Sequence, residues 1–275
     1  MMLINGKTTT LIDAHDRGLS YGDGLFETMV CVDNQFPLWR YHIERLKRGC
    51  HRLKIPLPDI DLLEAECKKL SCDLGVMKCI IKIIITRGDG NRGYRPGTQQ
   101  GTRIISAYHW PDNVPKYNSG ITVRWCQTRL GCAPLLAGIK HLNRLEQVLA
   151  SSEWDDPEIY EGLMLDQSNN VIEGTRTNFF IVKNDRLHTS EIDSCGVDGI
   201  IRQIICRDVV KHGLPVLIGN LSMKDVINAD ELLLCNSIVG LLPVNNIIDD
   251  VYPATYPSRT VSHRINRLLR ELMLD

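Results

Sequence analysis

The sequence predicts an α/β (α+β) protein of two domains, and three observations support this fold class. The chain has 275 residues, which is long for one compact domain and short for three. Segments with the period of an amphipathic helix alternate with β-branched, strand-like runs along its whole length. The stretch 111–119 contains Pro111 and Pro115 and lies between two strand-like runs, so it is the predicted interdomain linker. We therefore expect an N-terminal domain over 1–110 and a C-terminal domain over 120–275.

The first domain is expected to combine two helices with a sheet. Apolar residues recur at helical spacing in Arg40–Leu53 and again in Asp59–Leu74, which predicts two amphipathic helices. The near-continuous β-branched run Cys79–Thr86 predicts a strand that is buried on both faces, with Thr102–Ala107 as its partner. Between these strands, 87–97 is rich in glycine and also contains proline, which predicts a loop.

The second domain continues the alternation of strands and helices. Helices are predicted over His141–Trp154 and Gly199–Lys211. The predicted strands are Ile121–Trp125, Gly162–Asp166, Asn178–Val182 and Glu231–Cys235, and Val261–Met273 is the predicted closing helix.

Charge and composition indicate a protein that acts on a small molecule. The chain carries 32 basic and 33 acidic residues without a long run of either sign, so no electrostatic footprint for nucleic acid or a membrane surface is expected. The first residues lack the basic start and apolar stretch of a signal peptide. No apolar run reaches the roughly 18 residues of a membrane helix. These features predict a cytoplasmic protein.

The ten cysteines are expected to be reduced, mostly buried thiols and not a disulfide framework. They are scattered, and no pair has the C-x-x-C spacing. The eight histidines do not cluster with them, so no metal site is predicted.

Two lysines in apolar surroundings are candidates for a nucleophile toward carbonyls, because desolvation lowers the pKa of an amine. Lys82 interrupts the isoleucine-rich strand, and Lys140 lies between Ala137-Gly138-Ile139 and the start of the predicted helix at His141. Each also fits a surface lysine whose aliphatic stem alone is buried. Composition does not choose between the two.

Three further features carry possible chemistry. Glu173 stands just before a predicted strand, where it is either an ordinary surface turn residue or an acid placed for function. The glycine-flanked turn Gly196–Arg202 enters a predicted helix, whose free amides suit an anion such as phosphate, although most such turns bind nothing. Arg45 lies on one side of a predicted helix with His42, and its spacing fits a solvated helix charge equally well.

Six short motifs occur in a fixed order along the chain: Tyr21–Thr28, His42–Leu46, Lys140–Arg144, Glu173–Thr175, Gly199–Arg202 and Cys235–Ser237. In this order they resemble the fold-type IV pyridoxal-phosphate enzymes, which include branched-chain and D-amino-acid aminotransferases and aminodeoxychorismate lyase. Each motif has low specificity alone, but six in register over most of the chain are specific. The resemblance implies a two-domain fold like that of D-amino-acid aminotransferase, with a barrel-like second domain and the cofactor between the domains.

The resemblance also implies roles for individual residues. Lys140, and not Lys82, would carry pyridoxal 5'-phosphate as a Schiff base, and Glu173 would pair with the pyridine nitrogen. A carboxylate at that position favours the protonated ring, which is the better electron sink. The implied phosphate-binding groups are Arg45, the backbone amides of Ile200 and Ile201, and Ser237.

Within this family, two stretches resemble the aminodeoxychorismate lyase branch, Ala137–Leu149 and Arg87–Tyr94. Thr28 and Asn236 stand at substrate-side positions where the lyases are similar to this chain and branched-chain aminotransferases have glycine. The resemblance implies cleavage of aminodeoxychorismate to 4-aminobenzoate and pyruvate for folate synthesis, with Thr28 as a catalytic residue. It further implies a homodimer. Arg92 and Tyr94 are candidates for binding the substrate carboxylates, whereas the form Glu173-Gly174-Thr175-x-x-Asn178 is closer to D-amino-acid transaminases, which keeps an aminotransferase as the alternative.

Overall fold

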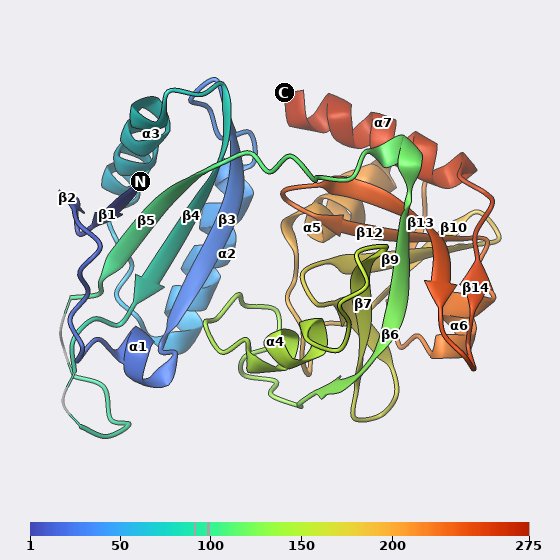
Figure 1. Cartoon of the computed structure of the whole chain (residues 1–275), viewed down its shortest axis with the longest axis horizontal. Coiled ribbons are helices and arrows are strands. Elements are labelled where there is room, and N and C mark those ends of the chain that lie inside the picture. The colour runs from blue at the N-terminus through green and yellow to red at the C-terminus, as the bar shows by residue number, and fades with distance from the viewer. Residues whose placement is uncertain (91, 98–99, 275) are drawn as a thin grey trace. The chain divides into compact units, whose positions relative to one another are not determined.

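The computed structural model describes residues 1–90, 92–97 and 100–274, which form two compact units (Figure 1). The first unit comprises Met1–Asp112 together with the short segment Ile139–Asn143. The second comprises 113–138 and the chain from Arg144 onward. The order of elements along the sequence could not assign 139–143 to the first unit, because that assignment depends on contacts between distant segments.

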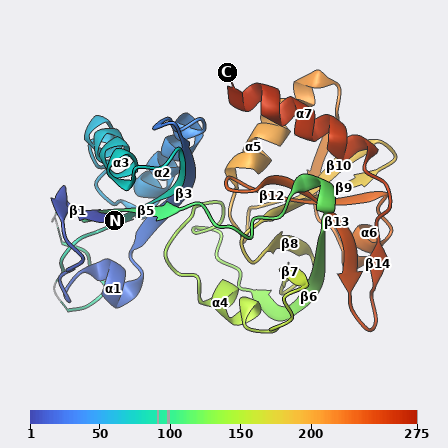
Figure 2. The ribbon, with the colours of Figure 1, turned by 45° about the horizontal axis from the view of Figure 1, so that its top comes forward.

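The first unit is a five-stranded antiparallel sheet in the order β2-β1-β5-β4-β3. Two helices, α2 (Trp39–Leu53) and α3 (Ile60–Leu74), lie over one face of this sheet (Figure 2). The short helix α1 (Arg17–Tyr21) precedes the strand β3. The strands are β1 (Met2–Ile4), β2 (Lys7–Thr8), β3 (Gly24–Val32), β4 (Lys78–Thr86) and β5 (Arg103–His109).

Both helices have the predicted amphipathic character and begin and end close to the predicted residues. In α3, the Asp59 carboxylate accepts a hydrogen bond from Leu62 N at 3.1 Å, and Gly75 ends the helix with a φ of 69°. In α2, a Cβ on Gly49 would meet the Leu25 side chain at 2.8 Å, so glycine lets the helix approach β3 closely. These helices bury the sheet face that bears Leu25 and Glu27.

The predicted burial of β4 on both faces is wrong for the chain by itself. Its side chains alternate, with Cys79, Ile81, Ile83 and Ile85 buried under the helices, and Ile80, Lys82 and Ile84 only partly covered. A run of β-branched residues indicates a strand, but it does not tell whether one face or both will be packed.

The second unit is built on a nine-stranded sheet in the order β11-β10-β9-β12-β13-β6-β7-β8, with β14 paired to β13. Side chains from β6, β7, β8, β9, β12 and β13 share one hydrophobic cluster, which includes Val123, Leu163, Phe179, Leu232 and Val244. The sheet therefore curves around its own core. Its strands are β6 (Ile121–Leu130), β7 (Ile159–Asp166), β8 (Val171–Gly174), β9 (Asn178–Lys183), β10 (Arg186–Ser190), β11 (Val216–Gly219), β12 (Glu231–Asn236), β13 (Gly240–Ile248) and β14 (Ala254–Thr255).

The helices of this unit are shorter than predicted in two places. The predicted helix over 141–154 is limited to α4 (Leu145–Ser151), because His141 pairs with Leu25 as an isolated β-bridge and does not start a helix. The predicted helix over 199–211 is α5 (Ile200–Arg207) followed by the 3-10 turn η2 (Val209–His212). The remaining elements are the 3-10 turn η1 (Tyr117–Ser119), α6 (Met223–Ile227) and the closing helix α7 (Thr260–Leu274).

All ten cysteines are free thiols, and burial raises the pKa of several of them, including that of Cys126 to about 12. Among the residues that the structure describes, no group of three or more His, Cys, Asp or Glu side chains is arranged to hold a metal ion. None of the described helices combines the length and the hydropathy that a membrane span requires.

Candidate active site

Lys140 lies in an extended segment beside the start of β3. Phe26 N donates to the Lys140 carbonyl at 2.9 Å, and Leu142 N donates to the Gly24 carbonyl at 3.0 Å. These bonds pair 139–143 with β3 in antiparallel fashion. The Lys140 ammonium lies 4.4 Å from the centre of the Phe26 ring. The sequence predicted that Lys140 stands at the start of a helix. In the structure it is held instead by backbone pairing to β3.

The other candidate lysine lies on the same sheet face. Lys82 is opposite Thr28 in the register of β3 and β4, and its ammonium is 5.4 Å from the Phe26 ring centre. Phe26 and Thr28 are two residues apart on one strand, so their side chains share this face. The structure thus brings the predicted residues Lys140 and Thr28 together on one surface, and it adds Lys82 to them.

The opposite face of β3 carries a buried group of charged residues. Glu27 accepts hydrogen bonds from Arg45 Nε at 2.8 Å and from Arg45 Nη2 at 2.5 Å, and it pairs with His42 Nδ1 at 2.6 Å. Arg45 is only 4% exposed, so the interpretation of this arginine as a solvated helix charge is wrong. The carboxylate holds its guanidinium in one orientation.

The pKa values of this group follow from burial and charge. Burial alone would raise the pKa of Glu27, but Arg45 and His42 outweigh it and bring that pKa to about 2. For His42 burial is the largest effect, and it lowers the pKa although Glu27 favours the imidazolium. His42 Nε2 is buried and has no hydrogen-bond partner within the described part of the chain. A neutral imidazole that donates from Nδ1 to Glu27 fits these observations.

Glu173 is a buried strand residue and not a surface turn residue. It lies in β8, and its Oε2 accepts a hydrogen bond from Val197 N at 2.8 Å. The Gln147 amide nitrogen is 3.5 Å from Oε1. The neighbouring Gly196 has a φ of 82°, a left-handed conformation that favours glycine and directs the Val197 amide to the carboxylate. A buried carboxylate fixed in this way suits a partner with a positive charge.

The start of α5 is the turn for which an anion site was predicted. Gly199 is the N-cap residue and has no side chain, so the amides of Ile200 and Ile201 receive no hydrogen bond from an N-cap side chain. Asn178 Oδ1 accepts from Gly199 N at 3.0 Å, and Asn178 Nδ2 donates to the Val197 carbonyl at 2.8 Å. A Cβ on Gly199 would lie 2.0 Å from Asn178 Oδ1, so a side chain there would break this arrangement.

The turn that carries Ser237 lies beside the same asparagine. β12 pairs with β9 so that Cys235 is opposite Asn178, and the chain turns at the next residues. Asn236 Oδ1 accepts hydrogen bonds from Ile238 N at 2.9 Å and from Val239 N at 3.0 Å. Its Nδ2 donates to the Arg176 carbonyl at 3.3 Å. Asn236 therefore shapes the turn that contains Ser237.

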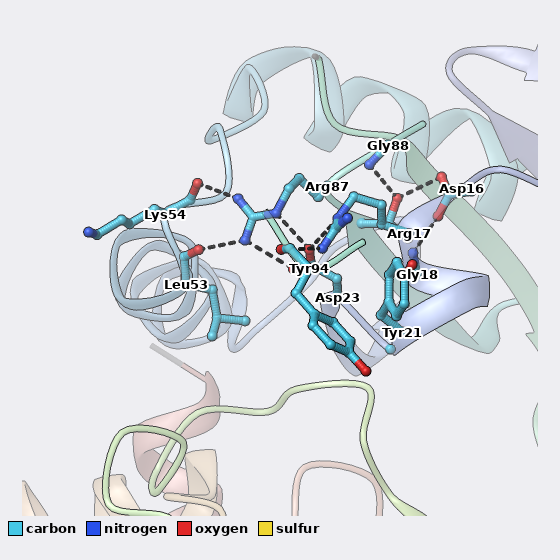
Figure 3. Close-up of polar contacts among 12 residues, drawn as sticks. Asp16, Arg17, Gly18, Tyr21, Asp23, Leu53, Lys54, Arg87, Gly88 and Tyr94 are labelled. Atoms are coloured by element: carbon cyan, nitrogen blue, oxygen red, sulfur yellow. Dashed lines mark hydrogen bonds and ion pairs between the residues drawn. The ribbon is translucent and has the colours of Figure 1, made fainter. Parts of the chain in front are cut away.

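The predicted substrate residues Arg92 and Tyr94 are exposed, Tyr94 to 85%. The backbone of their loop is nevertheless anchored, since Arg17 donates to the carbonyls of Gly93 and Tyr94 (Figure 3). Within the loop 87–97, residue 91 lies outside the described residues. Sequence reasoning did not identify Arg17 or its partner Asp23. The signal was present, because Asp23 stands in the Tyr21–Thr28 motif and Arg17 is a charged residue just before it.

These groups fit pyridoxal 5'-phosphate. This cofactor uses the donor and acceptor types found here, which are a lysine on an aromatic face, a buried carboxylate, a buried arginine and the backbone amides of a helix start. A family model described as amino-transferase class IV matches residues 24–247. The chain belongs to the class IV aminotransferase family. The predicted two-domain α/β fold of the fold-type IV enzymes and the pyridoxal-phosphate cofactor are thereby confirmed.

Three relatives place the chain within the class IV family. An aminodeoxychorismate lyase from Vibrio harveyi is 35% identical over 274 residues, which is 99% of this chain and 98% of the relative. A crystal structure of 4-amino-4-deoxychorismate lyase from Pseudomonas aeruginosa superposes with a TM-score of 0.91 at 38% identity, covering 98% of each chain. A putative branched-chain-amino-acid aminotransferase from Methanocaldococcus jannaschii is 30% identical, covering 89% of this chain and 86% of the relative.

Proposed function

We propose that this chain is a pyridoxal-phosphate-dependent aminodeoxychorismate lyase, which releases 4-aminobenzoate and pyruvate. The observation that carries the proposal is the position of Thr28, whose hydroxyl shares a sheet face with Phe26 and hence with Lys140. The similarity over nearly the full length to lyases of this activity supports it. The product suits a role in folate synthesis.

The residues divide the reaction between them. Pyridoxal phosphate, when bound, supplies an electron sink for the negative charge that develops on the substrate. The Lys140 amine holds the cofactor and then removes the proton from the ring carbon that bears the amino group. Thr28 donates a hydrogen bond to the enolpyruvyl oxygen as its bond to the ring breaks. The proton that Lys140 removed passes to the methylene carbon of the departing enolpyruvate, which becomes pyruvate. The ring becomes aromatic, which favours the products.

The cofactor-binding residues have separate tasks. Glu173 keeps the pyridine nitrogen protonated through its buried carboxylate. Arg45, the amides of Ile200 and Ile201, and the Ser237 hydroxyl bind the phosphate. Arg92 and Tyr94 receive the substrate carboxylates. Lys82 is a further cation for a carboxylate, because it lies beside Thr28 on the face that bears Lys140.

The assembly is a cytoplasmic homodimer in this proposal. Leu145, Val148 and Leu149 lie at helical i, i+3 and i+4 positions on α4, and all three are exposed in the single chain. An apolar patch of this kind is typical of a surface covered by a partner. Ten free thiols suit a reducing compartment.

The decisive experiment incubates the purified protein with aminodeoxychorismate and measures 4-aminobenzoate. The Lys140→Ala variant should lose this activity, together with the visible absorbance and the borohydride-dependent label on the lysine. Release of 4-aminobenzoate by Lys140→Ala at the wild-type rate would contradict the assignment of Lys140.

An aminotransferase remains the second candidate because the segment Glu173–Asn178 has the form of the D-amino-acid transaminases. The similarity to the putative branched-chain aminotransferase also favours it. Parallel assays with D-alanine, L-leucine and 2-oxoglutarate separate the two. Faster amino transfer than lyase turnover would replace the lyase proposal.

A further inference from the structure

A compact group of charges lies at the base of the loop 87–97, within the first unit (Figure 3). The Asp23 carboxylate binds Arg17 Nε at 2.9 Å, Arg87 Nε at 2.7 Å and Arg87 Nη2 at 3.0 Å. Both guanidinium groups are largely buried, and the two arginines outweigh the effect of burial, so that the pKa of Asp23 is lowered. Buried charges of this kind are tolerated only when each is paired and hydrogen-bonded, which gives the group one defined geometry.

Arg17 uses its remaining donors on the loop. Its Nη1 donates to the Gly93 carbonyl at 2.8 Å and its Nη2 donates to the Tyr94 carbonyl at 3.0 Å. Tyr21, on the same short helix, accepts a hydrogen bond from Gly93 N at 3.1 Å. The Tyr21 ring also lies edge-on to the Tyr94 ring at 5.6 Å, and the Arg17 guanidinium is 4.7 Å from the Tyr21 ring centre. Residues 93 and 94 are thus held from several directions.

Arg87 connects the same carboxylate to α2. Its Nη1 donates to the Lys54 carbonyl and its Nη2 to the Leu53 carbonyl, both at 2.7 Å, which satisfies the last carbonyls of the helix. Asp23 itself immediately precedes β3, the strand that carries Thr28. One carboxylate therefore ties the glycine loop to the strand and the helix that carry the candidate site residues of this unit.

We propose that Arg17 is a positioning residue for substrate binding, which fixes Arg92 and Tyr94 by holding the carbonyls of Gly93 and Tyr94. This inference rests on the proposed function of the loop as the carboxylate-binding segment. Arg17 is 4% exposed and its Nε, Nη1 and Nη2 all bind protein atoms, so it acts through the loop and not by touching substrate. The planar fork of arginine serves three acceptors in fixed directions, which a lysine ammonium cannot do.

The test compares the holoenzyme with Arg17→Lys, which keeps the charge and removes the fork. We expect KM for aminodeoxychorismate to rise at least about tenfold while kcat and cofactor affinity change little, because the chemistry on β3 is untouched. Trypsin should cleave the Arg92–Gly93 bond several-fold faster in the variant, as mass spectrometry of the fragments would record. Arg40→Lys, at an exposed ion pair on α2, is the matched control and should change neither KM nor the rate of trypsin cleavage.

Tyr21→Phe provides a milder second variant, since it removes only the hydroxyl that accepts from Gly93 N. It should shift KM and cleavage in the same direction by less, and a folded Tyr21→Phe protein keeps the inference testable if Arg17→Lys does not fold. Wild-type KM in both variants overturns the inference, even if trypsin cleavage is faster. A parallel decrease of kcat, cofactor affinity and melting temperature also overturns it, because that pattern is expected of a residue with a merely structural role.

Failure of the underlying function gives a different result. If the wild-type enzyme releases no 4-aminobenzoate, the lyase proposal fails and substrate positioning by Arg17 fails with it. If Arg92→Ala leaves KM unchanged while Arg17→Lys raises it, the carboxylate contact assigned to Arg92 is wrong and the positioning role of Arg17 stands.

Discussion

Thr28 separates the lyase proposal from its alternative at the scale of a single residue. Its side chain faces the same side of β3 as Phe26, against which the Lys140 ammonium lies. On the strand next to it, Lys82 is directly opposite. The hydroxyl is thus placed among the groups that would meet the substrate, and it lies away from the buried Glu27–Arg45 pair on the other face.

Thr28→Gly should therefore reduce lyase turnover far more than cofactor binding. We expect kcat for 4-aminobenzoate formation to fall by about 10²-fold, the usual worth of a positioned proton donor, while the cofactor Kd changes by less than about threefold. Thr28→Ser keeps the hydroxyl and is the control. Steady-state assays and cofactor titration measure the two quantities, and equal losses in both would remove Thr28 from the chemistry.

The comparison of Lys140 with Lys82 shows what the sequence could predict at this scale. Both lysines lie against Phe26, so the argument from apolar surroundings correctly selected two amines of one surface. It could not rank them, because Lys140 joins that surface through backbone pairing between segments over a hundred residues apart. Only the order of the family motifs favoured Lys140. Asp23 lies within the Tyr21–Thr28 motif, so a signal for it was present. The role of Arg17 could not be derived from it, because hydrogen bonds to the carbonyls of Gly93 and Tyr94 leave no trace in residue type.

At the scale of elements, the pairing of α2 with β3 through Glu27 gives the stability of the protein a defined dependence on pH. The pKa of Glu27 is about 2 in the folded chain against an ordinary 4.5, so its carboxylate stabilises the fold above pH 4.5. This contribution, roughly 3 kcal/mol from the shift in pKa, is lost as pH falls from about 4.5 toward 2. His42 acts in the same direction below its ordinary value of 6.5, because burial lowers its pKa.

Glu27→Gln should cost about 3–5 kcal/mol of unfolding free energy at pH 7, because it leaves the buried Arg45 without its counter-charge. The deficit should shrink as the pH falls from about 4.5 toward 2, because the carboxylate of the unfolded wild-type chain takes up a proton in this range before that of the folded chain does. Urea denaturation across this range measures it. Glu44→Gln, on the exposed side of α2, is the control and should stay within about 1 kcal/mol of wild type. A deficit independent of pH would refute this account of Glu27.

The start of α5 permits a second prediction about an element. Gly199→Ala would place a Cβ 2.0 Å from Asn178 Oδ1 and displace the turn that presents the Ile200 and Ile201 amides. Cofactor affinity should fall at least about tenfold, the equivalent of 1.4 kcal/mol. Gly219→Ala, where an added Cβ meets nothing within 4 Å, is the matched control. Titration of the apoprotein with pyridoxal phosphate measures both, and equal affinities would exclude this turn from the phosphate site.

Predictions for elements succeeded where the pattern was local. The helices α2 and α3 and the strands β4 and β12 were expected from periodicity and composition, and the structure has them at nearly the same residues. The helix predicted over 141–154 failed at its start, since His141 pairs with β3 and the helical pattern begins only at Leu145. A tertiary pairing that competes with helical periodicity is not visible in a short segment.

At the scale of the whole molecule, the chain divides into two units that are not continuous in sequence. The segment 139–143 leaves the second unit to join the first and carries Lys140 with it. The number of units follows from length and from the alternation of elements. That 139–143 belongs to the first unit does not follow from the sequence, because it depends on hydrogen bonds to β3 that only folding creates. Because Lys140 lies in this segment, its position depends on the folding of the first unit.

The apolar surface of α4 leads to the last prediction, which concerns assembly. Leu145 and Leu149 lie one turn apart and are 76% and 61% exposed in the single chain, so a partner surface would bury them with a favourable hydrophobic contribution. The double variant Leu145→Glu, Leu149→Glu should weaken the proposed dimer at least about 100-fold, because two charges would have to be buried without partners. Since both side chains are exposed, the fold of the single chain should persist. Light scattering at graded protein concentrations measures the mass, with Met77→Glu, an equally exposed apolar position in the first unit, as the control. A dimer of unchanged stability in the double variant would show that α4 is not part of the interface.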